Sequence, residues 1–310
     1  MSDVVLLFSG QGAQKVGMGK DFHEASETAR ALFRQADEAL GFGLSQIMFE
    51  GPDDELTRTS RCQPALYLHG LVALALLKER VGGLNPVAAA GLSLGEFTAH
   101  SAAGTFSFED GLRIVARRGL FMEEACEATQ GSMAALIGGE EGAVKALAAE
   151  CDVDVANFNA PGQIVLSGTV AGIDAAVEKA RDHGIRRAIK LNVAGAYHSR
   201  LMQPAQDKLA AELAGVAIQS PVLPVVCNFG ASVVSKPAEI RSMLEKQVTG
   251  SVRWTESIRL LVEKGHRTFI ELGPGKVLAG LVAKIEKDAT VHSVEDLASL
   301  EAVVEALSQR

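Results

Sequence analysis

The sequence predicts an α/β protein, with a large α/β-hydrolase-like domain built on a parallel sheet and a smaller inserted subdomain. Composition supports this class, because 31 glycines, nine prolines and 5% aromatic residues in 310 are typical of many short turns between strands and helices. Short, continuously apolar runs indicate buried parallel strands. Residues 91–95, Gly-Leu-Ser-Leu-Gly, lie between such a run and a helix-like stretch, which indicates a tight strand-to-helix turn.

Hydrophobic spacing predicts the elements of the large domain. Apolar residues recurring every three or four positions indicate helices, and apolar runs bounded by glycine or proline indicate strands. In chain order we predict a strand over 4–8, helices over 22–40 and 63–81, a strand over 87–90, helices over 96–103, 109–129 and 199–213, a strand over 222–227, helices over 237–248 and 255–264, a last strand over 267–272 and a closing helix.

From residue 132 the predicted elements become short and follow a recognisable order. They are a strand over 133–137, a helix over 141–150, strands over 153–158 and 163–167, a helix over 173–183 and a strand over 186–192. The order β-α-β-β-α-β is that of a ferredoxin-like unit, and Asn-Ala-Pro-Gly at 159–162 supplies its hairpin turn. We therefore predict a ferredoxin-like subdomain over 128–195, inserted into a large domain formed by 1–127 and 196–310.

Charge and composition narrow the classes of partner. The formal net charge of −8 argues against broad binding to nucleic acid or to an anionic membrane, while leaving room for a local cationic pocket. No apolar stretch approaches the length of about 18 residues that a membrane span needs. Four scattered cysteines without CxxC spacing and the absence of a signal-like amino terminus predict a cytoplasmic protein, which we expect to be a monomer.

Ser93 stands at the centre of the glycine-flanked pentapeptide. A serine on a nucleophile elbow needs almost no side chain two positions before and two after it, and glycine meets that need at 91 and 95. The serine also lies at the amino end of the next helix, where the helix dipole favours a developing oxyanion. The plainer alternative is that Ser93 only caps this helix.

A serine nucleophile needs a base, and His198 is the best of seven histidines. His100 is seven residues beyond Ser93 on the same helix, about 10 Å along it and too far for direct contact. His69 lies inside an apolar helical pattern and has the features of a core residue. His198 lies where the insertion rejoins the large domain, in the kind of loop that carries catalytic groups.

Arg118 lies on the apolar face of the predicted helix 109–129. Its neighbours one turn away are Ile114, Val115, Phe121 and Met122, whereas Arg117 belongs to a solvated stripe. A guanidinium cannot remain unpaired in such a place, and its fork of donors suits a carboxylate. Two alternatives stay open: a buried Asp or Glu, or the carboxylate of a substrate.

Other glycine-rich segments do not form phosphate or metal motifs. Residues 10–12 follow the first strand but lack the Gly-Lys-Ser/Thr of a P-loop, and Gly273-Pro274-Gly275-Lys276 fails at the hydroxyl position. The first loop is better suited to supply a second oxyanion donor, so that the backbone N–H groups of Gln11 and Leu94 form the pair. We expect no metal site, since the sequence holds neither His-Glu-x-x-His nor a cysteine cluster.

Eight segments in order resemble the malonyl-CoA:acyl carrier protein transacylases, the FabD family, over nearly the whole chain. They are Phe8-Ser9-Gly10-Gln11-Gly12-Ala13-Gln14, Gln63-Pro64-Ala65-Leu66, Gly91-Leu92-Ser93-Leu94-Gly95-Glu96, Arg118-Gly119, Asn157-Phe158-Asn159-Ala160-Pro161-Gly162-Gln163, Tyr197-His198-Ser199, Val252-Arg253-Trp254 and Glu271-Leu272-Gly273-Pro274-Gly275.

The resemblance implies a ping-pong transfer in two halves. Ser93 takes malonyl from malonyl-CoA as an ester and gives it to the phosphopantetheine thiol of acyl carrier protein, with His198 acting first as base and then as acid. No cofactor of the enzyme's own is implied, because the phosphopantetheine belongs to the carrier. The product supplies fatty-acid or polyketide synthesis.

The resemblance also assigns supporting roles by motif position. Gln11 and Leu94 supply oxyanion N–H groups, and Arg118 clamps the free malonyl carboxylate. Gln63 borders the site. Two residues are expected to support His198: Gln247, through its main-chain carbonyl, and Asn159 as a second candidate.

Two residues depart from the family pattern. Leu92 stands where histidine is common, beside the elbow and outside the proton transfer. Tyr197 stands where phenylalanine is common, next to the expected base, and bears on the choice between malonyl and methylmalonyl. Malonyl is favoured. The remaining alternatives are a methylmalonyl-specific acyltransferase, a serine thioesterase or hydrolase that uses water as acceptor, and a non-catalytic scaffold.

Overall fold

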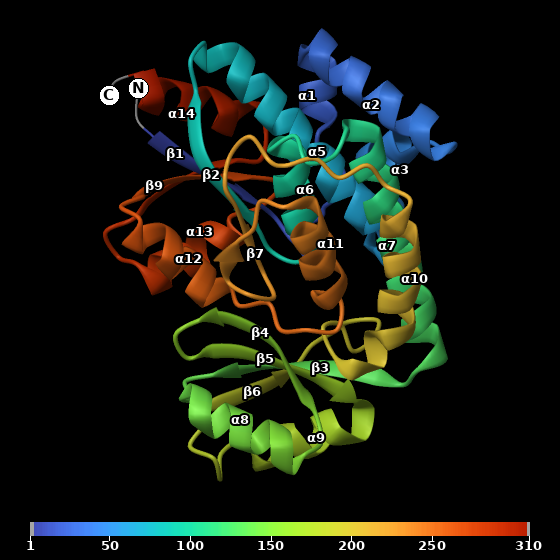
Figure 1. Cartoon of the computed structure of the whole chain (residues 1–310), viewed down its shortest axis with the longest axis vertical. Helices are drawn as coiled ribbons and strands as arrows, with labels where there is room; N and C mark the ends of the chain where they lie inside the picture. Colours follow the sequence, from blue (N-terminus) through green and yellow to red (C-terminus); the bar gives the residue numbers. More distant parts are fainter. Residues whose placement is uncertain (1–2, 309–310) are drawn as a thin grey trace.

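A mixed, mainly parallel sheet forms the larger part of the computed structural model, which describes residues 3–308 (Figure 1). Its strand order is β10-β9-β1-β2-β7-β8, with every neighbouring pair parallel except β7 and β8. The strands are β1 (Asp3–Phe8), β2 (Asn85–Gly91), β7 (Val225–Cys227), β8 (Ser232–Val233), β9 (Thr268–Leu272) and β10 (Thr290–Val294). The carboxyl ends of β1 and β2 therefore meet at one edge, where parallel sheets carry their sites.

Helices cover both faces of this sheet, and β1 shows why. Its side chains alternate between two buried clusters: Val4 and Leu6 pack with α5, α6 and α7, and Val5 and Leu7 pack with α12 and α13. The helices of this part are α1 (Lys20–Ala25), α2 (Glu27–Leu40), α3 (Leu44–Glu50), α4 (Asp53–Thr57), α5 (Thr59–Val81), α6 (Leu94–Ala102), α7 (Phe108–Ala128), η1 (Arg200–Met202), α10 (Gln203–Ala214), α11 (Pro237–Lys246), α12 (Trp254–Glu263), α13 (Val277–Ile285) and α14 (Leu297–Ser308).

The second sheet is small and antiparallel, in the order β4-β5-β3-β6. Figure 1 shows α8 and α9 packed on its face that lies away from the larger sheet. Its elements are β3 (Gly131–Ile137), α8 (Glu141–Glu150), β4 (Asp154–Ala160), β5 (Gln163–Thr169), α9 (Val170–Lys179) and β6 (Arg187–Lys190). The order along the chain is the β-α-β-β-α-β that the sequence predicts. β4 is joined to the larger part through backbone hydrogen bonds between Val252 and residues 156 and 158.

The structure departs from the predicted elements in four places. Helix 22–40 is two helices, because Ser26 leaves helical geometry and caps α2 through the N–H of Ala29. The short α3 and α4 hold too few turns for their spacing to be detected. β10 and α14 follow the strand that we predicted to be the last, since the half-polar β10 lacks the apolar run of a buried strand. The antiparallel β8 makes the larger sheet mixed rather than parallel.

Within residues 3–308, no helix combines the length and the apolar character that crossing a membrane requires.

Close packing of α5 against α7 gives a first prediction. A Cβ on Gly119 of α7 would lie 2.5 Å from the carbonyl oxygen of Thr59, whereas a Cβ on the exposed Gly280 of α13 meets no atom within 4 Å. We expect Gly119→Ala to lower the free energy of unfolding by about 1–3 kcal/mol through overpacking. The control Gly280→Ala should raise it by about 0.5–1 kcal/mol, as alanine does in a helix interior. Urea unfolding measures both, and equal effects would contradict the packing argument.

Candidate active site

Ser93 lies on a sharp turn between β2 and α6, with φ 56° and ψ −109°. Such a backbone costs about 1–3 kcal/mol for a residue other than glycine, so the surroundings must hold it. A Cβ on Gly91 would lie 2.0 Å from the carbonyl group of Gly95, and a Cβ on Gly95 would lie 2.2 Å from the carbonyl oxygen of Phe8. Glycine is therefore required at both flanking positions, and the serine side chain is left free to face the cavity.

His198 lies against Ser93 and also has a left-handed backbone, with φ 56°. Its Nε2 is 2.8 Å from Ser93 Oγ, and its Nδ1 is 2.8 Å from the main-chain oxygen of Gln247. A carbonyl oxygen only accepts, so Nδ1 carries the hydrogen and Nε2 presents its lone pair to the serine hydroxyl. Burial, and after it the charge of Arg118, lowers the pKa of His198 to about 4. The imidazole is neutral near pH 7, the state that a general base needs.

Arg118 of α7 is 1% exposed and contacts the serine. Its Nη1 donates to Oε1 of Gln63 at 2.7 Å, and its Nη2 donates to Oγ of Ser93 at 3.1 Å and to Oε1 of Gln247 at 2.9 Å. All three acceptors are uncharged. Burial lowers the pKa of Arg118 to about 10, which still leaves it protonated at neutral pH. Within residues 3–308 no carboxylate pairs with this guanidinium directly.

Gln247, just after α11, connects these groups through both its main chain and its side chain. Its Nε2 donates to the main-chain oxygen of Ser93 at 2.9 Å and to Oε2 of Glu96 at 2.6 Å. Its Oε1 accepts from Arg118, and its main-chain oxygen accepts from His198. The sequence indicated only the last of these contacts. The side-chain contacts depend on the approach of α11 to the elbow, which no local pattern encodes.

Asn228 is a residue of this network that sequence reasoning missed. Its Oδ1 accepts the N–H of Ser93 at 2.7 Å, and its Nδ2 donates to the main-chain oxygen of Gly91 at 2.7 Å. The side chain thus spans the elbow and holds it. One signal could have revealed it: Asn228 directly follows β7, whose carboxyl end lies at the same sheet edge as the carboxyl end of β2.

A cavity of about 810 Å³ opens in front of Ser93 and His198. Gln11, Gln63 and Leu94 also line it, so the two expected oxyanion donors border the same cavity as the serine. Leu94 opens α6, where the first N–H groups have no acceptor within the helix. Gln63 and Ser93 both accept hydrogen bonds from Arg118, so the guanidinium contacts two residues that line this cavity.

Asn159 lines the same cavity but does not support the imidazole. Both nitrogens of His198 have other partners, Ser93 and Gln247, so no ring nitrogen is left for Asn159. Its Oδ1 is buried and has no hydrogen-bond partner within the described part of the chain. In this structure Asn159 therefore makes no hydrogen bond to the ring, because the carbonyl of Gln247, directly after α11, is the partner of Nδ1.

Fold and site together define a class of protein. A serine on a strained strand-to-helix turn, an imidazole on its hydroxyl and helix N–H groups beside it form the apparatus of serine-dependent acyl transfer or hydrolysis. The model of the acyl transferase domain family matches residues 5–306, nearly the whole chain.

Individual relatives are similar over their full length. The chain is 42% identical to the malonyl CoA-acyl carrier protein transacylase of Bacillus subtilis (strain 168), covering 100% of this chain and 98% of that protein. It is 36% identical to the protein of the same description from Escherichia coli (strain K12), covering 98% and 100% respectively. The chain therefore belongs to the malonyl CoA-acyl carrier protein transacylase family.

Solved structures agree with this assignment. The acyl carrier protein S-malonyltransferase of Vibrio cholerae superposes with a TM-score of 0.94 at 36% identity, covering 97% of this chain and 100% of that chain. A malonyl-transacylase solved in complex with a type II PKS acyl-carrier protein gives a TM-score of 0.95 at 35% identity, covering 98% of this chain and 100% of that chain. Both match the two-sheet α/β architecture.

The hydrogen bonds of Asn228 to the elbow give the next prediction. Asn228→Ala leaves the N–H of Ser93 and the carbonyl of Gly91 without their side-chain partner, at about 1–3 kcal/mol for a buried group. We expect lower stability and acylation of Ser93 slower by at least about tenfold, since 1.4 kcal/mol corresponds to a factor of ten. The control is Asn85→Ala, at the exposed opposite end of β2, which should acylate normally. Stopped-flow measurement of acylation decides, and a normal rate in Asn228→Ala would contradict the role given to Asn228.

Proposed function

We propose that this chain transfers malonyl from malonyl-CoA to the phosphopantetheine thiol of acyl carrier protein through an ester on Ser93, supplying fatty-acid or polyketide synthesis. The observation that carries this function is the buried Arg118 guanidinium, whose acceptors are all uncharged and one of which is Ser93 Oγ itself. The relatives described above are malonyl transacylases, and one was solved with an acyl-carrier protein.

In the first half-reaction, Nε2 of His198 takes the proton of Ser93 Oγ as the oxygen attacks the thioester carbonyl. The carbonyl π electrons move to oxygen, and the N–H groups of Gln11 and Leu94 stabilise that oxyanion. When the intermediate collapses, the carbon–sulfur bond breaks and the coenzyme A thiolate takes from His198 the proton that Ser93 gave up. The second half-reaction repeats these steps, with the carrier's thiol as nucleophile and Ser93 as leaving group.

No acidic third member is needed to hold the base. The carbonyl of Gln247 fixes the imidazole in the tautomer whose Nε2 is unprotonated. A nearby cation disfavours the imidazolium, so the proton has a short residence on His198 and is available to the leaving thiolate. Hydrogen bonding from Arg118 to Ser93 Oγ stabilises the developing alkoxide at the same moment.

Arg118 selects the acyl group in this proposal. A malonyl group on Ser93 carries a free carboxylate that can accept from the guanidinium, whereas acetyl leaves that cation with neutral partners only. Gln63 borders the carboxylate position. Tyr197, whose hydroxyl is 2.6 Å from Oγ1 of Thr59, lies on the cavity wall beside His198 and limits room for the extra methyl of methylmalonyl.

We also propose the finer organisation that the sequence indicates. Residues 1–127 and 196–310 form an α/β-hydrolase-like domain, and residues 128–195 form a ferredoxin-like subdomain that closes the cavity with β4 and β5 residues such as Asn157 and Val165. The four cysteines are free, three of them buried, which supports a cytoplasmic setting. We propose that the enzyme acts as a monomer and needs no cofactor of its own.

The covalent intermediate is the direct test of this function. We expect incubation with malonyl-CoA to add one malonyl group to the intact protein, located on Ser93 by peptide mass spectrometry and absent from Ser93→Ala. The adduct should survive in water and disappear when phosphopantetheinylated carrier protein is added. Rapid loss to water would favour a hydrolase, and an unmodified protein would exclude the covalent route.

The role of Arg118 predicts a change in acyl preference. Arg118→Ala removes hydrogen bonds worth about 1.5–3 kcal/mol for a charged group, so malonyl acylation should fall by about tenfold to a hundredfold. Acetyl transfer should improve relative to malonyl. The matched control is Arg117→Ala, one residue away on the solvated face. Comparison of kcat/KM for malonyl-CoA and acetyl-CoA measures the effect, and an unchanged ratio in Arg118→Ala would reject the clamp.

A further inference from the structure

Glu96 is a buried carboxylate behind the elbow that the mechanism above does not use. It lies on α6, three residues after Ser93, and is 0% exposed. Its Oε2 accepts the N–H of Asn228 at 2.9 Å and Nε2 of Gln247 at 2.6 Å. A charged side chain with no exposure is costly unless its partners compensate, so the contacts of this carboxylate must offset that cost.

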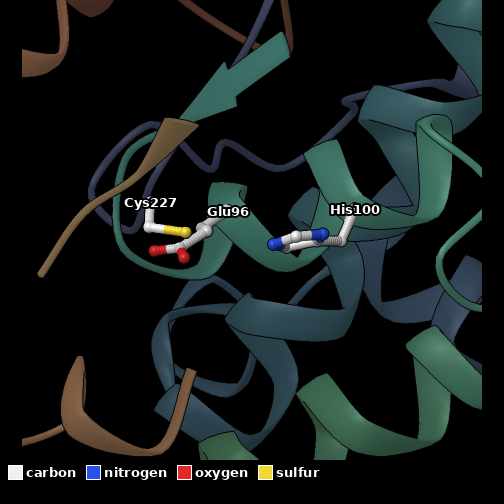
Figure 2. Close-up of side chains that lie close together, drawn as sticks. All are labelled: Glu96, His100 and Cys227. Atoms are coloured by element: carbon white, nitrogen blue, oxygen red, sulfur yellow. The ribbon is translucent and has the colours of Figure 1, made fainter. Parts of the chain in front are cut away.

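Figure 2 shows the carboxylate of Glu96 between the thiol of Cys227, which comes from β7, and the imidazole of His100 on the same helix. One ligand-type atom from each side chain lies within 4.8 Å of the others. Sulfur, nitrogen and oxygen are donors that transition metals accept, but a metal needs the thiolate. Burial, reinforced by Glu96, raises the pKa of Cys227 far above its usual range, and Oε2 of Glu96 is already committed to two N–H groups. The cluster suits a protonatable carboxylate better than a cation.

Glu96 is connected to Arg118 through a single amide. Gln247 donates from Nε2 to the carboxylate and accepts at Oε1 from Nη2 of Arg118, so the amide dipole bridges an anion and a cation. This arrangement places the negative charge of Glu96 near the guanidinium without occupying the terminal N–H donors of Arg118. The fork is left to neutral acceptors that a substrate carboxylate can replace.

The same carboxylate also reaches the other two reacting groups. Through Gln247 it fixes the carbonyl that orients His198, and through Asn228 it fixes the side chain that accepts the N–H of Ser93. Ser93, His198 and Arg118 are thus each linked to Glu96 through one intervening residue, Asn228 or Gln247.

We propose that Glu96 is a positioning residue for acyl transfer: as a carboxylate it holds Gln247 and Asn228 in place and acts as the resting counter-charge of Arg118. This inference rests on the proposed malonyl transfer. Glu96 itself touches no substrate, and it acts on the reacting groups only through its two partners.

The proposal has a pH signature, because the neutral carboxyl is a weaker acceptor and carries no counter-charge. Burial raises the pKa of Glu96 to about 7, against the hydrogen bonds from Asn228, Gln247 and Cys227 and the charge of Arg118. The other titratable neighbour is His100, which burial keeps neutral by lowering its pKa to about 3. Activity should therefore rise as Glu96 ionises near pH 7, well above the pKa of about 4 of His198, which lies across Gln247.

Glu96→Gln tests the role, with malonyl acylation followed from pH 5 to pH 9. Weakening hydrogen bonds to a charged group corresponds to about 10–100-fold, and we expect kcat to fall by that factor. KM for malonyl-CoA should stay equal or fall, since Arg118 has lost its resting counter-charge. The rise in activity near pH 7, which we call the limb, should be absent in this variant. The matched control is Glu271→Gln, another fully buried carboxylate that accepts two N–H groups, from Leu278 and Ala279, which should keep the wild-type profile.

Each outcome bears on the proposal. A Glu96→Gln enzyme with the wild-type kcat and limb overturns it, and so does a Glu271→Gln enzyme that loses the same limb. If Glu96→Gln does not fold, Glu96→Asp keeps the charge with a shorter reach, and should retain the limb near pH 7 at a lower kcat. A wild-type profile without that limb also overturns the proposal. Absence of any malonyl ester in the wild type would instead refute the proposed function.

Discussion

A guanidinium ion held inside the protein, within hydrogen-bond distance of a serine hydroxyl, is the constraint on which the site depends. Placing a charge in the interior costs several kcal/mol unless neighbours compensate, and here the direct neighbours are neutral. α5 supplies Gln63, the elbow supplies Ser93, and the segment after α11 supplies Gln247. Each element must arrive at one point for Arg118 to remain charged. The same position of Arg118 suits the cavity to an acyl group with a carboxylate, because that carboxylate can accept hydrogen bonds from the guanidinium.

Backbone strain and hydrogen bonding characterise Ser93 and His198, the proposed nucleophile and base. Ser93 and His198 both have φ 56°, a region that side chains rarely adopt, and both are held by polar contacts from distant parts of the chain. Asn228 holds the serine turn, and the carbonyl of Gln247 holds the imidazole. The strain is therefore stored at the two residues to which we assign the chemistry, and the glycines around the elbow allow the backbone to pass so closely.

Much of this architecture could be predicted from local sequence patterns, whereas the rest depends on contacts between distant parts of the chain. Glycines two residues on either side marked Ser93, and apolar neighbours one turn away marked Arg118, because both signals lie within one element. The partners of these residues come from elsewhere in the chain: Asn228 and the side chain of Gln247 approach only after the sheet has formed. The expected contact between Asn159 and His198 depends on the same kind of approach, and in the structure both ring nitrogens have other partners. In the fold, long periodic helices and apolar strands were readable, whereas β8, β10 and the short α3 and α4 were too short or too polar.

The position of the acyl carboxylate in a crystal structure of the malonyl-Ser93 enzyme tests the central claim most directly. The account predicts that this carboxylate lies within hydrogen-bond distance of the terminal nitrogens of Arg118, in place of one of the neutral acceptors the guanidinium has in the empty enzyme. A carboxylate directed toward the cavity mouth, with Arg118 still bonded to Gln63, Ser93 and Gln247 alone, would contradict it.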